Sequence, residues 1–271
     1  MQIMHLSDLV DYLAVTRKKV IFTMGKGGVG KTTIAAAIAL GLAGKGAKVH
    51  LTTTDPAAHL KFVLSDSESI TMSHIDEKAE LKKYQSEVLT KAKENGMSDS
   101  DLAYIEEDLR SPCTQEIAVF RAFAEIVDKA GDENVVIDTA PTGHTLLLLE
   151  STQSYNREIQ RTKGETPECV RKLLPRLKSD ETEVIIVTLP EATPVYEALR
   201  LENDLNRANI SAHWWVINSS LYAADIQNDL LKAKAANEIT WINRVNRHTN
   251  GSFAFVEWKT VEVKGNMLRE L

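Results

Sequence analysis

A glycine-rich segment near the N-terminus limits what this chain can fold into more than any other feature. Residues 25–32 read GKGGVGKT and fit the phosphate-binding loop pattern G-x-x-x-x-G-K-S/T. That pattern requires a strand before the loop and a helix after it. The apolar run 19–24 and the alanine-rich run that starts at Thr33 meet both requirements. We therefore predict an α/β fold of the P-loop NTPase class.

The composition of the loop has a chemical reason. Glycines let backbone N–H groups turn toward phosphate oxygens, and the following helix directs its positive end at the same anion. Lys31 is expected to reach the terminal phosphates and Thr32 to offer its hydroxyl to Mg²⁺, so ATP and Mg²⁺ are the predicted cofactors. The expected nucleotide-binding residues in this segment are Gly25, Lys26, Gly27, Gly28, Val29, Gly30, Lys31, Thr32 and Thr33.

Composition and charge exclude several other classes. With 43% apolar and 26% charged residues, the 271-residue chain is ordinary for a globular protein. Its net charge of -6 leaves no basic face for nucleic acid. No apolar run approaches the ~20 residues that a membrane span needs, so direct insertion is not expected. Asp8 and Asp11 interrupt the N-terminal apolar positions where a signal peptide would be continuous, so we expect a cytoplasmic protein.

Alternation of strand-like and helix-like segments predicts a doubly wound, mostly parallel sheet. Apolar spacing over residues 7–16 indicates an amphipathic helix, which makes 1–18 a linker-like segment before a P-loop domain at 19–271. Two helical insertions are expected, at about 61–133 and 145–180. The expected strands are 19–24, 48–53, 134–139, 184–189, 214–218 and 252–256, and helices are expected at 31–43, after Ser111, from Pro194 and at about 225–238.

Three polar residues lie at or just beyond the ends of expected strands, at the edge of the sheet where nucleotides bind. Asp55 either orients a water for attack on the γ-phosphate or belongs to an ordinary Asp-Pro turn. Asp138 has the form of the strand-end aspartate in the magnesium shell, so the predicted magnesium set is Thr32, Asp55 and Asp138. Asn218 either recognises the adenine edge through two hydrogen bonds or simply ends its strand.

Thiol and imidazole groups form a second set of candidates. Ser111 is the expected N-cap of a helix that begins at Pro112, which puts Cys113 at a helix N-terminus, where thiolate and hence soft-metal ligation are favoured. A lone cysteine is also often an inert core residue. His144 is a metal ligand, a proton-linked group or a buried histidine. Cys113 and Cys169 are expected to be free thiols or metal ligands rather than a disulfide.

Four segments carry a resemblance to a known family, namely residues 24–33 (MGKGGVGKTT), 54–60 (TDPAAHL), 111–117 (SPCTQEI) and 138–146 (DTAPTGHTL). Together they closely resemble the arsenical-pump-driving ATPases, in particular their C-terminal half, over nearly the whole chain. The resemblance implies an ATPase stimulated by arsenite or antimonite that energises efflux through a separate membrane subunit. Such an ATPase would lie peripherally at the inner membrane.

The resemblance also implies roles for individual residues. The lysine that matches Lys26 reaches the nucleotide of a second P-loop half, either identical or distinct. The residue that matches Asp55 is the water-activating base, and that matching Asp138 supports magnesium and the switch. The metalloid site is implied at Ser111, Cys113 and His144, with Cys169 as a weaker match.

Two alternatives share the lysine-bearing loop. Tail-anchored membrane-protein targeting ATPases have a client groove of apolar helices, whereas the insertion around 75–109 is heavily charged. Partition or division-site ATPases need a basic face or a membrane-binding tail, and residues 261–271 are too short and mixed in charge for that. The chain departs from the resembled family after its last strand, where Glu257-Trp258-Lys259 replaces an apolar, proline-containing stretch.

Overall fold

The structure, a computed structural model, describes residues 4–54, 70–139 and 167–271. Its centre is a seven-stranded sheet with the order β3-β2-β4-β1-β5-β6-β7, and every neighbouring pair is parallel. The prediction of a doubly wound parallel sheet is confirmed. The strands are β1 (Val20–Met24), β2 (Val49–Thr53), β3 (Ile70–His74), β4 (Asn134–Asp138), β5 (Thr182–Thr188), β6 (Trp214–Ser220) and β7 (Phe253–Glu257).

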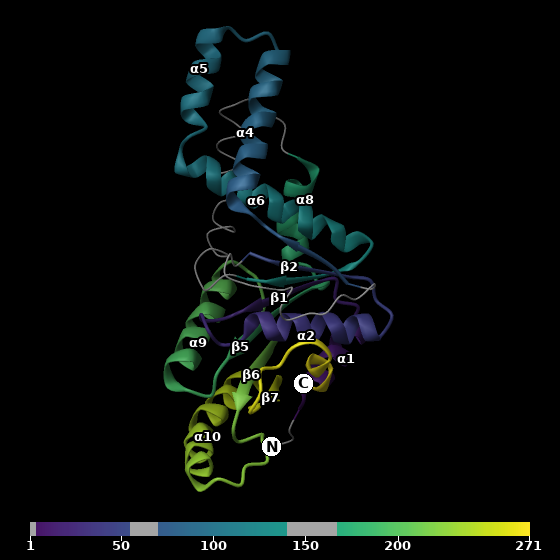
Figure 1. Cartoon of the computed structure of the whole chain (residues 1–271), viewed down its shortest axis with the longest axis vertical. Coiled ribbons are helices and arrows are strands. Elements are labelled where there is room, and N and C mark those ends of the chain that lie inside the picture. Colours follow the sequence, from purple (N-terminus) through teal and green to yellow (C-terminus); the bar gives the residue numbers. More distant parts are fainter. Residues whose placement is uncertain (1–3, 55–69, 140–166) are drawn as a thin grey trace.

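Helices cover both faces of this sheet (Figure 1). One face packs against α1 (Leu6–Val15), α2 (Lys31–Gly44) and the short 3-10 helix η2 (Gly265–Glu270). The other packs against α6 (Pro112–Asp128), α8 (Glu168–Leu177), α9 (Ala192–Arg207) and α10 (Asp229–Thr249), while the 3-10 helix η1 (Lys129–Gly131) follows α6. Because both faces are covered, the central strands β1 and β5 are buried at every position and contain apolar runs.

The predicted N-terminal helix is α1, and it packs on α2 within this chain. Leu6, Leu9 and Leu13 are buried along one side of α1. A Cβ atom on Gly41 of α2 would lie 2.9 Å from Val10 Cγ1, so only glycine permits this close approach of the two helices. The alanine-rich composition of α2 therefore serves packing on two sides, against the sheet and against α1.

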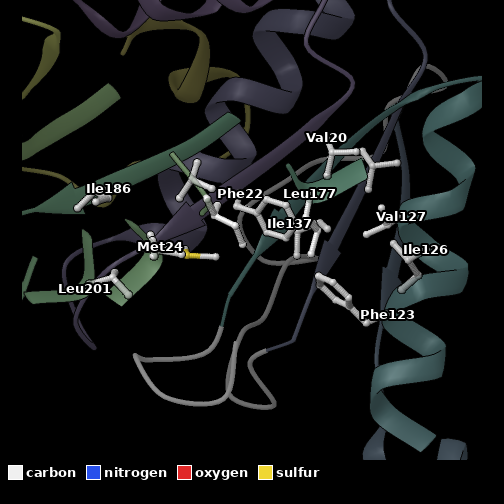
Figure 2. Packing of buried hydrophobic residues seen from close by; sticks show 14 of the residues in the cluster. Val20, Phe22, Met24, Phe123, Ile126, Val127, Ile137, Leu177, Ile186 and Leu201 are labelled. Carbon is white, nitrogen blue, oxygen red and sulfur yellow. The ribbon is translucent and has the colours of Figure 1, made fainter. Parts of the chain in front are cut away.

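The core on the opposite face is built from larger side chains. Figure 2 shows Phe22 of β1 and Ile137 of β4 meeting Phe123 and Val127 of α6. The rings of Phe22 and Phe123 lie 5.8 Å apart between centroids. This contact fixes α6, and with it residues 111–113, relative to the phosphate-loop strand.

A helical hairpin of α4 (Glu77–Glu94) and α5 (Asp99–Asp108) extends away from the sheet beyond α6 (Figure 1). Both helices are capped by side chains, Asp76 on α4 and Ser98 on α5. No residue of α5 is buried, and in α4 only Ala92 is. The hairpin therefore presents a largely charged surface, and its assignment to a first insertion stays a prediction.

The structure differs from the sequence-based expectation in two elements. Strand β3 lies in a region that we expected to be largely helical, because its sequence ITMSH has no apolar run and only Ile70 is buried. Helix α10 extends to Thr249, well beyond the expected end near 238. The domain boundary at 18/19 and the second insertion stay predictions, since residues 140–166 lie outside the described chain.

A search of the described helices for a membrane span found none of sufficient length and apolarity.

Candidate nucleotide site

The phosphate loop connects β1 to α2 and depends on glycine at two close approaches. Gly25 has φ 152° and Gly30 has φ 91°, both in the region that favours glycine. A Cβ atom on Gly25 would lie 2.2 Å from the Val187 carbonyl oxygen, and one on Gly30 would lie 2.2 Å from Asn218 Nδ2. The loop backbone is therefore pressed against β5 and β6, and larger residues would displace it.

Lys31 is the first residue of α2, and its side chain folds back over the loop. Its Nζ donates a hydrogen bond to the Lys26 carbonyl oxygen at 3.1 Å, and the residue is only 6% exposed. A buried ammonium group beside a loop of backbone N–H groups makes this end of α2 electropositive. Such a site suits an anion.

Oxygen atoms from three elements meet at Asp138. Thr32 Oγ1 donates to Asp138 Oδ2 at 2.7 Å, and Thr53 Oγ1 donates to the same oxygen at 3.2 Å. Asp138 is fully buried at the end of β4, between the ends of β1 and β2. The structure thus brings together two of the three residues expected in the magnesium shell.

The ends of these strands are also joined through backbone groups. The Thr54 N–H donates to the Asp138 carbonyl at 2.9 Å, and Thr139 Oγ1 donates to the Thr23 carbonyl at 2.9 Å. Asp55 follows Thr54 directly but lies outside the described residues, as does His144. Their predicted roles stay predictions.

Asn218 lies near the end of β6 and contacts the phosphate loop. Its Nδ2 donates to the Val29 carbonyl at 2.9 Å, and the residue is buried. The side chain therefore holds the loop in place through β6. A contact with adenine stays a prediction.

Lys26 is exposed and pairs with a residue of α9, unlike the buried Lys31. Its Nζ lies 3.6 Å from Glu197 Oε1 of α9, and both side chains are well exposed, at 38% and 42%. The lysine expected to act on a second half is thus paired with a carboxylate of its own chain. The sequence pattern did not identify Glu197.

The expected metalloid residues begin at the start of α6. Ser111 is the N-cap residue, as predicted, but its Oγ lies 3.0 Å from Thr114 Oγ1 and makes no hydrogen bond to the helix backbone. The backbone of Cys113 is in the first turn of α6, while its side chain lies outside the described part of the structure.

Cys169 is the second residue of α8 and a free thiol. Burial raises its pKa, and the carboxylate of Glu125 on α6 raises it further. Arg121 also acts on the thiol, so Cys169 lies beside the later turns of α6. Because Arg121 is eight residues beyond Cys113, the start of the helix is about 12 Å away along its axis. Among described residues, no group of three or more His, Cys, Asp and Glu side chains is placed to hold a metal ion.

Sequence reasoning missed several polar residues at this edge of the sheet. Thr53 and Thr139 both bind strand-end groups, and Glu197 binds the loop lysine. The two threonines had a usable signal, since Thr139 directly follows Asp138 and Thr53 lies two residues before Asp55, both at the ends of predicted strands. Glu197 had none, because it lies in a helix far along the chain.

Comparison with known proteins places these residues in a wider context. The family model described as "Anion-transporting ATPase" matches residues 18–179 and 162–267. An arsenical pump-driving ATPase of Escherichia coli is 46% identical over 270 residues, 99% of this chain and 46% of that protein. A second from the same species is 48% identical over 253 residues, 93% of this chain and 43% of that protein. ATPase GET3A of Arabidopsis thaliana is 28% identical over 253 residues, covering 80% of this chain and 71% of the relative. The chain thus spans less than half the length of the two bacterial relatives.

Proposed function

We propose, from the premise that this chain belongs to the anion-transporting ATPase family, that it hydrolyses ATP in response to arsenite or antimonite and energises their efflux through a separate membrane subunit. One observation supports ATP binding. At the phosphate loop, Thr32 is hydrogen-bonded to Asp138, and the buried Lys31 is hydrogen-bonded to the loop backbone. The metalloid part is supported by the names of the bacterial relatives at 46–48% identity.

The described residues fit a nucleotide and a hard divalent cation. The glycine positions leave a cradle that Cβ atoms would fill, and the donors around Asp138 are all oxygen atoms, which Mg²⁺ prefers. A bound Mg²⁺ would supply positive charge that offsets the negative charge developing during phosphoryl transfer. Thr32 and Asp138 are the residues that would hold its shell.

Each side chain has a proposed role in phosphoryl transfer to water. Lys31 leaves the Lys26 carbonyl and binds the terminal phosphates, so that its charge offsets that of the phosphoryl group. Asp138 keeps the Thr32 hydroxyl oriented through the 2.7 Å hydrogen bond. Asp55 orients and deprotonates the attacking water.

The active form would contain two P-loop halves. This chain covers 46% or less of the bacterial relatives, so a second half is either another copy or a distinct chain or domain. Lys26 would then leave Glu197 and reach the nucleotide of that second half. Ser111, Cys113 and His144, with Cys169 as a weaker candidate, would bind the metalloid where the halves meet. The complex would lie in the cytoplasm, at the inner membrane through the efflux subunit.

Tail-anchored protein targeting is the main alternative, because a related ATPase of that wider group is 28% identical. The charged hairpin of α4 and α5 disfavours an apolar client groove among the described residues. Stimulation of ATP hydrolysis by arsenite or antimonite distinguishes the proposed function from this alternative.

The test is an ATPase assay of the purified chain with and without antimonite. Wild-type hydrolysis should rise when antimonite is added, and Lys31→Ala should remove turnover in both conditions. Cys113→Ser should keep basal hydrolysis but lose stimulation, because a hydroxyl binds a thiophilic centre weakly. Cys169→Ser tests the weaker candidate in the same way, since stimulation that survives this change excludes Cys169 from the metalloid site. Antimonite stimulation that survives Cys113→Ser refutes the assignment of Cys113 to the metalloid site. If the chain hydrolyses no ATP, either with a second copy of itself or with a distinct second half, the proposed ATPase activity is refuted.

A further inference from the structure

A buried carboxylate fixes the turn that follows β6. Glu238 of α10 is 4% exposed and accepts three hydrogen bonds. Its Oε2 accepts from Ser220 Oγ and from the Tyr222 N–H, both at 3.0 Å, and its Oε1 accepts from the Leu221 N–H at 3.2 Å. A carboxylate with both oxygens occupied by donors is well suited to a buried position.

The backbone that Glu238 holds is not a regular strand end. Ser219 has φ 54°, which is rare for a residue with a side chain, and the pairing of β6 with β7 shifts register between Ile217 and Ser220. The Trp258 N–H donates to the Ser220 carbonyl at 3.0 Å, so the residue after β7 is joined to the same turn. This irregular backbone persists because its surroundings hold it.

The turn is connected to the phosphate loop through β6. Asn218, two residues before Ser220, donates to the Val29 carbonyl of the loop at 2.9 Å. Nucleotides on such sheets lie beyond the carboxyl ends of the strands. The Asp138 oxygen cluster lies on the β2 and β4 side of the loop, whereas Asn218 contacts the loop from the β6 side.

We propose that Glu238 is a positioning residue for the purine base of the bound nucleotide. It acts through the backbone of Leu221 and Tyr222 and the hydroxyl of Ser220, which form a wall of the base site together with the segment after β7. This inference rests on the proposed ATPase function and adds a determinant of base recognition. The half-exposed Tyr222 side chain, 42% exposed, borders the same site.

Glutamine cannot replace this carboxylate without a loss. The Oε1 and Oε2 atoms both face hydrogen-bond donors, and the NH₂ group of a glutamine would oppose a backbone N–H at one of them. Glu238→Gln should therefore loosen the turn while the phosphate loop itself stays intact. Glu202→Gln is the matched control, since Glu202 is also buried but accepts from Trp215 Nε1 near the start of β6.

The experiment is calorimetric titration of the full chain with ATP and with tripolyphosphate in the presence of Mg²⁺. Wild type should bind ATP more tightly than tripolyphosphate. Glu238→Gln should weaken ATP binding about tenfold and change tripolyphosphate binding less than about twofold, so that the ratio of the two affinities falls. Glu202→Gln should leave this ratio unchanged. In turnover, Glu238→Gln should raise the KM for ATP with kcat unchanged.

Each outcome separates this inference from the proposed function. If wild type binds neither ATP nor tripolyphosphate, the proposed function fails. If wild type binds ATP and tripolyphosphate equally, or Glu238→Gln weakens both equally, the role of Glu238 in base recognition is overturned. Should Glu238→Gln not fold, Ser220→Ala removes one of the three hydrogen bonds and decides between the same results.

Discussion

The two lysines of the phosphate loop lie in opposite environments. Lys31 is buried against the loop backbone, whereas the Lys26 side chain is 38% exposed and paired with Glu197. Exposed ion pairs contribute little to folding, typically less than about 1 kcal/mol. The Lys26–Glu197 pair therefore sets where the ammonium group lies in the free chain and is easily broken when a phosphate competes for it.

Lys26→Ala should separate function from stability. The free energy of unfolding in urea should change by less than about 1 kcal/mol, because the lost pair is exposed. The kcat for ATP should fall by at least about tenfold, because Lys26 is proposed to neutralise charge in the transition state of a second half. Glu197→Gln is the control and should retain turnover. Full activity of Lys26→Ala would exclude the proposed role.

Among individual residues, the sequence predicted the phosphate loop and the aspartate at the end of β4, but not the hydrogen bonds that connect them. The pattern at residues 25–32 and its flanks correctly predicted β1, the loop and α2. The hydrogen bond from Thr32 to Asp138 spans 106 residues, and that from Asn218 to Val29 spans 189. Contacts of that separation depend on strand order, which neither periodicity nor a local motif determines.

Among the elements, the edge of the sheet contains a polar ladder around the buried His50. His50 of β2 places Nδ1 2.8 Å from Thr71 Oγ1 and Nε2 2.8 Å from Ser73 Oγ of β3. Burial lowers the pKa of His50, Lys129 lowers it further, and Glu133 opposes the shift. The histidine is therefore expected to be neutral in the folded chain at neutral pH. It joins β2 to β3 through the hydroxyl groups of Thr71 and Ser73.

The lowered pKa makes stability depend on pH in a definite direction. Below the ordinary value of 6.5, the unfolded chain binds a proton that folded His50 resists, so stability is lost as the pH falls from about 7 toward and through the folded pKa. His50→Gln should reduce this dependence between pH 7.5 and 5.5, measured by urea unfolding at both values. His74→Gln, which replaces an exposed histidine at the end of β3, is the control. If His50→Gln leaves the pH dependence of the free energy of unfolding unchanged, that dependence does not come from His50.

The same ladder explains why β3 was not predicted. Thr71 and Ser73 point their hydroxyl groups at His50, so β3 has no continuous apolar run and shows apolar–polar alternation over only a few residues. At the edge of the sheet, only Ile70 of β3 is buried. Central strands such as β5, buried at every position, were found because their apolar runs are continuous.

For the whole molecule, two features favour assembly with a second half. The Lys26 side chain is exposed, and this chain covers less than half of the length of its bacterial relatives. If that half is another copy, ATP and Mg²⁺ should shift the solution mass from 30.1 kDa toward twice that value. Sedimentation of wild type and Lys31→Ala, with and without ATP, measures this shift. The wild type should shift and Lys31→Ala should not, since Lys31 is proposed to bind the phosphates that join the halves. A wild-type mass unaffected by ATP would favour a distinct partner.

The strand order also constrains the order in which the protein can form during its synthesis. β1 is flanked by β4 and β5, so the strand that leads into the phosphate loop has no neighbour until at least residue 134 has been made. The loop then lacks its contact with Asn218 until β6 follows. A nascent chain released from the ribosome before β6 would therefore carry the complete glycine motif without a formed nucleotide site.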